Sequence, residues 1–223
     1  MREGEGISIT FSKAISSDEN ADIGIGTLII FIAMLLIAGV TASVLIQTMN
    51  NMQQQAVKTS EETLRDVSSG LEVTHVSGWV YSTKIGKLAI FINPTSSSGG
   101  IDLTYTYISL SDSNKTYILN YTRACFSSTV SNSLFTTVNS SKLTNRTYGI
   151  IVIRDIDGSC TQTLPIINER DLVVLMVNTT KCFSGITTNT AVFGQVIPEV
   201  GMSGVIGFNT PSSYVDRIID VQP

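Results

Sequence analysis

Few side chains in this sequence could take part in catalysis. The chain has a single histidine, His75, so it offers no second histidine for a metal site. Its many serines and aspartates would allow a Ser/His/Asp triad by composition alone. However, the sequence has no Gly-x-Ser-x-Gly elbow, no nucleotide-binding loop and no cysteine pair at zinc spacing. We therefore expect His75 to be a packing or surface residue, and we predict no enzymatic activity and no cofactor.

The segment from Asp155 to Ser159 resembles the beginning of a calcium-binding loop. Asp155 and Asp157 alternate along the chain, and carboxylates supply the hard oxygen ligands that calcium takes. A complete loop would need a bidentate glutamate at its twelfth position, which here is Ile166. Asp and Gly also tolerate the backbone angles of a tight turn. The sequence therefore favours a hairpin turn over a metal site.

Three cysteines, Cys125, Cys160 and Cys182, all lie in the second half of the chain. If this part is exported to an oxidising space, one disulfide and one remaining thiol are expected, and the sequence does not select among the three pairings. In an anaerobic or hot habitat all three could instead stay reduced and be buried as small apolar groups. The sequence is compatible with both arrangements.

Five Asn-x-Ser/Thr sequons are candidates for N-glycosylation, and they begin at Asn114, Asn120, Asn139, Asn145 and Asn178. Four of them lie within residues 114–147. Charged residues make up only 14% of the chain, so attached sugar would supply hydrophilicity that the charges do not. The net charge of −4 and the pI near 4.9 also argue against nucleic acid as a partner, since binding phosphate backbones requires clustered Lys and Arg.

The element that dominates the sequence is an uncharged stretch from Ile23 to Val57, whose apolar part runs from Ile25 to Ile46. A helix rising about 1.5 Å per residue needs roughly 20 apolar residues to cross a bilayer core, so this stretch is long enough to span a membrane. Its apolar residues occupy every helical face and must be buried in lipid or among other helices. Small residues within it permit close helix approach, which a simple lipid anchor does not require. The residues that we expect to pack against neighbouring helices are Ile25, Leu28, Phe31, Ala33, Leu35, Ala38, Gly39 and Ala42.

Residues 1–21 have no apolar core of their own, so they do not form a conventional secretory signal. A cut between Ala21 and Asp22 would remove them and keep the apolar helix. At the other end, Ser68 to Gly70 are helix-stopping residues. We therefore predict a leader over residues 1–21, a helix over 22–69 and an extracellular domain over 70–223.

Beyond Gly70 the pattern changes to short alternating runs rich in Val, Ile, Tyr and Phe, which are typical of strands. The predicted strands are Leu71 to Tyr81, Lys87 to Ile92, Tyr105 to Leu110, Tyr117 to Leu119, Gly149 to Arg154, Leu172 to Val177, Ala191 to Ile197, Val205 to Phe208 and Tyr214 to Val221. The stretch from Thr122 to Thr147 is predicted to be an insertion loop. The fold class is α+β, with a long N-terminal hydrophobic helix followed by an antiparallel, immunoglobulin-like β-sandwich.

The residues from Asp22 to Met34 resemble the mature N-terminus of archaellins, the archaeal flagellins, almost position by position. Gly26 stands fifth in the mature chain, where type IV pilins generally carry Glu, so the archaellin resemblance is the better one. Archaellins usually carry Lys or Arg just before the cut, whereas this chain has Glu19 and Asn20. The resemblance continues through residues 44–46, 53–55, 154–159, 194–199 and 208–214.

The resemblance implies that a prepilin-type peptidase cuts between Ala21 and Asp22, and that the precursor sits in the membrane before the archaellum export machinery assembles it. It further implies a homopolymer, or a co-polymer with other archaellins, that forms the extracellular filament used for swimming. One alternative is a type IV pilus-like subunit of an adhesive filament. Another is a membrane-anchored enzyme or binding protein, which would need a pocket with converging polar groups.

Overall fold

The computed structural model describes the backbone of residues 6–95 and 99–223, and the side chains from Ile23 onward except Arg65 within these ranges. The chain divides into two compact units at the junction of Ser60 and Glu61.

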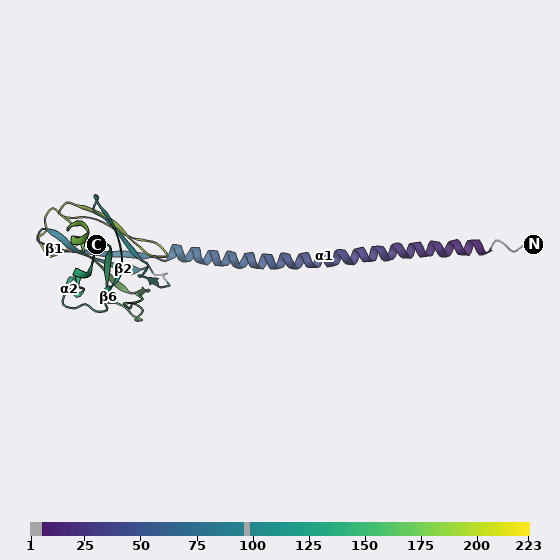
Figure 1. Cartoon of the computed structure of the whole chain (residues 1–223), viewed down its shortest axis with the longest axis horizontal. Helices are drawn as coiled ribbons and strands as arrows, with labels where there is room; N and C mark the ends of the chain where they lie inside the picture. The colour runs from purple at the N-terminus through teal and green to yellow at the C-terminus, as the bar shows by residue number, and fades with distance from the viewer. Residues whose placement is uncertain (1–5, 96–98) are drawn as a thin grey trace, which may run out of the picture. The chain divides into compact units, whose positions relative to one another are not determined.

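The first unit consists of one helix, α1 (Gly6–Ser68), which continues a short way into the second unit (Figure 1). This helix contains no proline, so nothing interrupts its backbone ladder. It ends at Ser68, two residues before Gly70, as the helix-stopping residues predict. Within the second unit, the chain after α1 pairs at once with Met202, whose N–H donates to the carbonyl of Ser69 (2.9 Å) and whose carbonyl accepts from Leu71 (2.9 Å).

The second unit is β-rich, and its main sheet has nine strands. They are β1 (Leu71–Tyr81), β2 (Lys84–Pro94), β4 (Tyr107–Ser111), β5 (Thr116–Ser127), β6 (Thr147–Arg154), β8 (Leu172–Val177), β9 (Ala191–Ile197), β10 (Gly204–Asn209) and β11 (Ile218–Gln222). A separate pair is formed by β3 (Ile101–Asp102) and β7 (Ile166–Ile167). Three short helical segments are α2 (Leu134–Thr137), the 3-10 turn η1 (Ser140–Lys142) and α3 (Thr179–Phe183).

The nine strands follow the order β10-β9-β4-β5-β6-β8-β2-β1-β11, and the two ends of this sheet approach each other. Gln222 on β11 bridges the gap through its side-chain amide. Its Oε1 accepts the N–H of Gly207 on β10 (2.9 Å), and its Nε2 donates to the carbonyl of Val205 (3.2 Å). A side chain thus supplies the hydrogen bonds that a neighbouring strand would make, and the sheet is nearly closed.

The predicted α+β class, with a long apolar helix before a β-rich domain, is confirmed. The predicted sandwich has two separate sheets, whereas the structure has one nearly closed sheet whose opposite sides face each other. All its strand pairs are antiparallel except β5 with β6, which is parallel. A parallel neighbour requires a long crossover, and the predicted insertion provides one. Its outer parts belong to β5 and β6, and its middle carries α2 and η1.

Apolar residues on the inner face of the sheet form the main core, which includes Leu88, Ile90, Val173 and Leu175. The alternate residues of the same strands face outward into a second core, where Ala89, Val174 and Met176 pack under the insertion. The strand β8 reads as an unbroken apolar run because both of its faces are covered. Phe135 of α2, with Val138 and Leu143, closes this second core from outside.

Candidate assembly surface

The largest apolar surface of the protein lies on α1. From Ile23 to Val67, every large apolar side chain that the structure describes is exposed, including Leu28 (58%), Phe31 (60%) and Leu36 (66%). Within the described residues, α1 is also the one helix that is long and apolar enough to cross a membrane. The predicted packing residues Ile25, Ala33, Ala38, Gly39 and Ala42 all belong to this exposed helix. The predicted cleavage residues Ala21 and Asp22 lie on the same helix, but their side chains are outside the described set.

The few hydroxyl groups in this apolar stretch are satisfied within the helix. Thr27 donates to the carbonyl of Gly24 (2.9 Å), Thr41 to that of Ile37 (2.7 Å), and Thr48 to that of Val44 (2.8 Å). A helix also satisfies its own backbone groups away from its ends. These polar groups already have hydrogen-bond partners inside the helix. The helix surface can therefore move from water into lipid, or against other apolar helices, without leaving polar groups unsatisfied.

The small residues of α1 have no evident role in the packing of this chain. A Cβ built at Gly39 would meet nothing within 4 Å, so the space beside that glycine is open. Phe31, Leu35, Ala38 and Ala42 follow one another at intervals of three or four residues and therefore share one helical face. This face has large side chains near its start and small ones further on, as expected where a second helix comes close.

The side chains of Ser77, His75 and Asp220 lie together but do not have the order of a catalytic triad. His75 Nε2 lies 2.9 Å from Asp220 Oδ1, and the Ser77 hydroxyl donates to that same oxygen (2.9 Å). The carboxylate therefore stands between the serine and the imidazole, whereas a triad needs the imidazole between the serine and the carboxylate. The hydrogen bonds from Ser77 and then His75 lower the pKa of Asp220. These contacts attach β11 to β1.

All three cysteines are free and buried. Cys125 belongs to the second core, while Cys160 and Cys182 belong to the main core. Burial raises the pKa of the Cys160 thiol to about 12 and that of Cys182 to about 11, and it also raises the pKa of Cys125. The thiols are therefore protonated at neutral pH and poor nucleophiles. Of the two arrangements that the sequence leaves open, the structure contains the one with three buried thiols.

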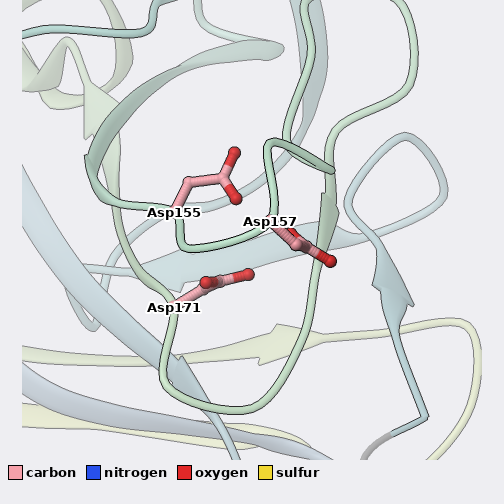
Figure 2. A group of neighbouring side chains, drawn as sticks. All are labelled: Asp155, Asp157 and Asp171. Atoms are coloured by element: carbon pink, nitrogen blue, oxygen red, sulfur yellow. The ribbon is translucent and has the colours of Figure 1, made fainter.

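The segment after Asp155 bends but does not form the predicted hairpin, because β6 pairs with β5 and β8 and the next strand, β7, pairs with β3. The fold brings a third carboxylate to this bend. Oxygens of Asp155, Asp157 and Asp171 lie within 4.8 Å of one another (Figure 2). The Asp155 carboxylate accepts the N–H groups of Gly158 (2.8 Å) and Cys160 (3.0 Å). Hydrogen bonds with Ser159 lower the pKa of Asp157. An all-oxygen group of this kind could ligate a hard cation such as calcium, and its described contacts hold the turn to the start of β8.

Sequence reasoning missed Asp171, because it lies well beyond Asp157 in the chain. It directly precedes β8, the strand that pairs antiparallel with β6, and Asp155 directly follows β6. Adjacent ends of an antiparallel pair lie together, so the pairing of these two strands would have indicated the contact. The side chain of Asp171 is fully buried and accepts N–H groups from Ile156 (3.3 Å) and Asn168 (2.9 Å).

The structure separates the five sequons into two groups. Asn114, Asn120, Asn139 and Asn145 are exposed. Asn178 is 8% exposed, and its side-chain nitrogen donates to the carbonyl of Ser140 (2.9 Å). In the folded chain this amide nitrogen ties α3 to the insertion and is not presented for modification.

An exposed apolar N-terminal helix that precedes a compact β domain is typical of a subunit of a surface filament. The comparison with known proteins gives the particular family. The family model of archaeal-type flagellin matches residues 21–208. Flagellin B2 of Methanocaldococcus jannaschii is 40% identical over 203 residues, which cover 89% of this chain and 94% of that protein. The chain therefore belongs to the archaeal-type flagellin family.

Two solved structures resemble this one. The crystal structure of archaeal flagellin FlaB1 from Methanocaldococcus jannaschii matches with a TM-score of 0.63 and 33% identity, covering 69% of this chain and 97% of that one. The archaeal flagellum of Methanospirillum hungatei matches with a TM-score of 0.61 and covers 90% of this chain and 99% of that one. At 13% identity, this second match shows a shared fold.

Proposed function

We propose that this chain polymerises through α1 into the filament of an archaeal flagellum, outside the cell, and that it performs no chemistry. The observation that carries the proposal is the exposure of the apolar side chains around α1. Burying each large side chain is worth roughly 1.5 to 3 kcal/mol, so some fifteen of them amount to tens of kcal/mol before conformational entropy is subtracted. Many copies of the same helix would supply the surface that replaces lipid.

A contact of this kind joins different faces of successive copies and need not close into a ring, so it generates an open filament. Its partners are therefore further copies of this chain or closely related subunits. The family assignment supports this reading over the adhesive-pilus alternative, which no described feature favours.

The precursor would sit in the membrane through α1 and be cut between Ala21 and Asp22 by a prepilin-type peptidase before export and assembly. An uncut leader would place the acidic residues Asp18 and Glu19 beside the apolar bundle, where unpaired charge is costly. Mass spectrometry of intact protein from filaments should show a chain that begins at Asp22. Filaments built from chains that begin at Met1 would contradict this order of events.

Glycans on the β domain would face the surroundings of the filament. Of the exposed sequons, those at Asn114, Asn139 and Asn145 lie in the turn after β4 or in the insertion, and that at Asn120 lies on β5. We expect sugar at one or more of these positions and none at the buried Asn178.

The polymerisation surface is tested by Ala38→Leu, with Ala38→Ser as the matched control. Leucine would hold neighbouring helices apart at a position where the chain itself leaves room, whereas serine keeps the side chain small. Electron microscopy of material sheared from cells should show filaments for Ala38→Ser and none for Ala38→Leu. Thermal unfolding of the β domain should be the same in both variants, since α1 and the domain core are separate units.

Normal filaments from Ala38→Leu would show that close approach at this residue is unnecessary. Absence of filaments from the unaltered mature chain, in cells that swim, would contradict the proposed function as a whole.

A further inference from the structure

A hollow of about 380 Å³ lies on the outside of the β domain, where the β1–β2 hairpin meets α3. Its volume is within the range of small-molecule sites. The side chains that line it combine two aromatic rings, two ammonium groups, an amide and a hydroxyl. We call it the lysine hollow and define it by Trp79, Tyr81, Lys87, Asn178, Thr180 and Lys181.

Strand pairing and one helix bring these residues together. Trp79 and Tyr81 alternate along β1, and the residue between them belongs to the main core, so both rings lie on the outer side of the sheet. Lys87 on β2 is the cross-strand partner of Trp79. The hydroxyl of Thr180 donates to the carbonyl of Gly86 (3.2 Å), which holds α3 beside β2. The lining therefore comes from three elements that the fold fixes next to one another.

The charges in the lysine hollow are all positive. Lys87 and Lys181 line it, Lys84 lines a smaller adjoining hollow, and neither lining contains Asp or Glu. Among the residues that the structure describes, none of these three lysines forms an ion pair. The chain as a whole carries a net charge of −4, so this positive region is a local exception. Such a region attracts a negatively charged ligand.

Lys87 is the part of this region best prepared for an anion. Its Nζ donates to the carbonyl of Phe135 (2.7 Å), which occupies one of three N–H donors. Burial lowers the pKa of Lys87, because its surroundings stabilise the ammonium charge less well than water does. A bound anion would supply the missing counter-charge. Trp79 packs on the Phe135 ring, with 5.5 Å between centroids, so its ring is held in place before any ligand arrives.

We propose that the lysine hollow binds an acidic saccharide, that is, a sugar ring that bears a carboxylate. The carboxylate would accept charge-assisted hydrogen bonds from Lys87 and Lys181. The apolar face of the sugar ring would pack on Trp79 or Tyr81, whose side chains combine an apolar body with a polar edge. A small inorganic anion would leave the rings uncovered, and an apolar ligand would leave the lysines without a counter-charge.

Two sources could supply this saccharide. One is a polysaccharide from outside the filament. The other is a glycan on Asn139 of the same chain, an exposed sequon that directly precedes Ser140. The Ser140 carbonyl accepts the side-chain N–H of Asn178, which lines the hollow, so a sugar on Asn139 would begin close to it (2.9 Å between Asn178 Nδ2 and the carbonyl oxygen). This second source rests on the glycosylation proposed above.

The single tryptophan of the chain makes the hollow directly observable, since all tryptophan fluorescence comes from Trp79. Mature chain made without glycosylation is studied in micelles of a detergent that has no sugar headgroup. Tetragalacturonate should change the fluorescence saturably. Neutral maltotetraose and inorganic sulfate should each need at least about tenfold higher concentration, because one lacks the charge and the other lacks the ring. No saturable change with tetragalacturonate, or an equal response to either control, would overturn the proposal.

Two substitutions test the charge and the ring separately. Lys181→Gln and Tyr81→Ala should each weaken tetragalacturonate binding about fivefold. The matched controls are Lys115→Gln, in the exposed turn after β4, and Tyr105→Ala, at a tyrosine that is 64% exposed outside the hollow. Both controls should bind as the unaltered chain does. Thermal unfolding shows that each variant is folded. Unchanged binding by both Lys181→Gln and Tyr81→Ala would assign the fluorescence change to another site and overturn the proposal.

The chain purified from cells distinguishes the two sources. If a glycan on Asn139 fills the hollow, this chain should not respond to tetragalacturonate, whereas Asn139→Gln from the same cells should respond. If the saccharide comes from outside, both should respond. Either result supports the hollow as a saccharide site, and silence of both together with the unglycosylated chain overturns it. Because the measurements are made in micelles, their failure would leave α1-driven polymerisation standing.

Discussion

The helix α1 and the β domain are built from the same apolar residue types, yet they bury them in different ways. Leu28 on α1 is 58% exposed, while Leu88 on β2 is fully buried by its own chain. In the domain, strand alternation directs apolar side chains to an inside that the sheet itself encloses. In α1, apolar residues occupy every face, and a single helix has no inside. The difference means that the domain buries its core residues by itself, whereas α1 can bury its apolar residues only in lipid or against further copies.

The comparison predicts opposite consequences for similar changes in the two regions, and the largest effect is expected on α1. Leu28→Asp places a charge in the apolar helix, which costs about 3 kcal/mol at the centre of a bilayer. Filaments should be absent by electron microscopy, while the unfolding temperature of the β domain stays unchanged. Leu28→Ile is the control and should assemble. Filaments from Leu28→Asp would mean that this part of α1 stays in contact with water in the filament.

In the domain, Leu88→Ala should destabilise the fold and leave the properties of α1 intact. Removing a fully buried leucine leaves a cavity and costs about 3 kcal/mol. For a domain of this size the unfolding temperature should fall by about 10 °C. Circular dichroism in detergent measures it, with Leu28→Ala as the matched substitution on α1. Equal melting of both variants would contradict the division into two units.

A smaller effect is expected at the carboxylate group that closes the turn after β6. Asp171→Ala leaves the N–H groups of Ile156 and Asn168 without their acceptor, which should cost about 2 kcal/mol. Asp171→Asn keeps one acceptor oxygen and should cost less. Urea unfolding of the two variants gives the comparison. An unchanged midpoint for Asp171→Ala would show that water replaces the lost hydrogen bonds.

The smallest effect concerns Asp220, whose pKa is lowered by hydrogen bonds from Ser77 and His75. A lowered pKa means that the ionised carboxylate stabilises the fold above its unfolded value of about 4, and that this contribution disappears as the pH falls through the lower folded value. The exposed position keeps the effect small. The difference in unfolding temperature between the unaltered chain and Asp220→Asn should therefore be present at pH 6 and vanish in acid. A difference that persists in strong acid would contradict this account.

Much of the domain was predictable because alternation is a local signal. The predicted bounds of Leu71–Tyr81, Leu172–Val177 and Ala191–Ile197 match β1, β8 and β9 as observed. The short strands β3 and β7 were missed, since two residues are too few to show a period. The helices α2 and α3 were missed for the same reason.

Some features of the candidate sites could be predicted from the sequence and others could not. The apolar surface of α1 follows from composition, and the residues expected to pack there are exposed in the single chain, while their packing stays a prediction. The burial of Asn178 and the third carboxylate from Asp171 depend on contacts between segments far apart in the chain. The sequence alone does not indicate whether the side chain of a sequon asparagine or of an aspartate is exposed or buried.

The sequence by itself determined that a helix apolar on every face precedes a β domain, because side-chain type and period act over a few neighbouring residues. Only the tertiary structure decided that nine strands nearly close upon themselves through Gln222 and that the insertion covers one outer face of the sheet. These outcomes depend on which strands become neighbours. The pairing of strands is decided by packing over the whole domain, and no local sequence pattern indicates it.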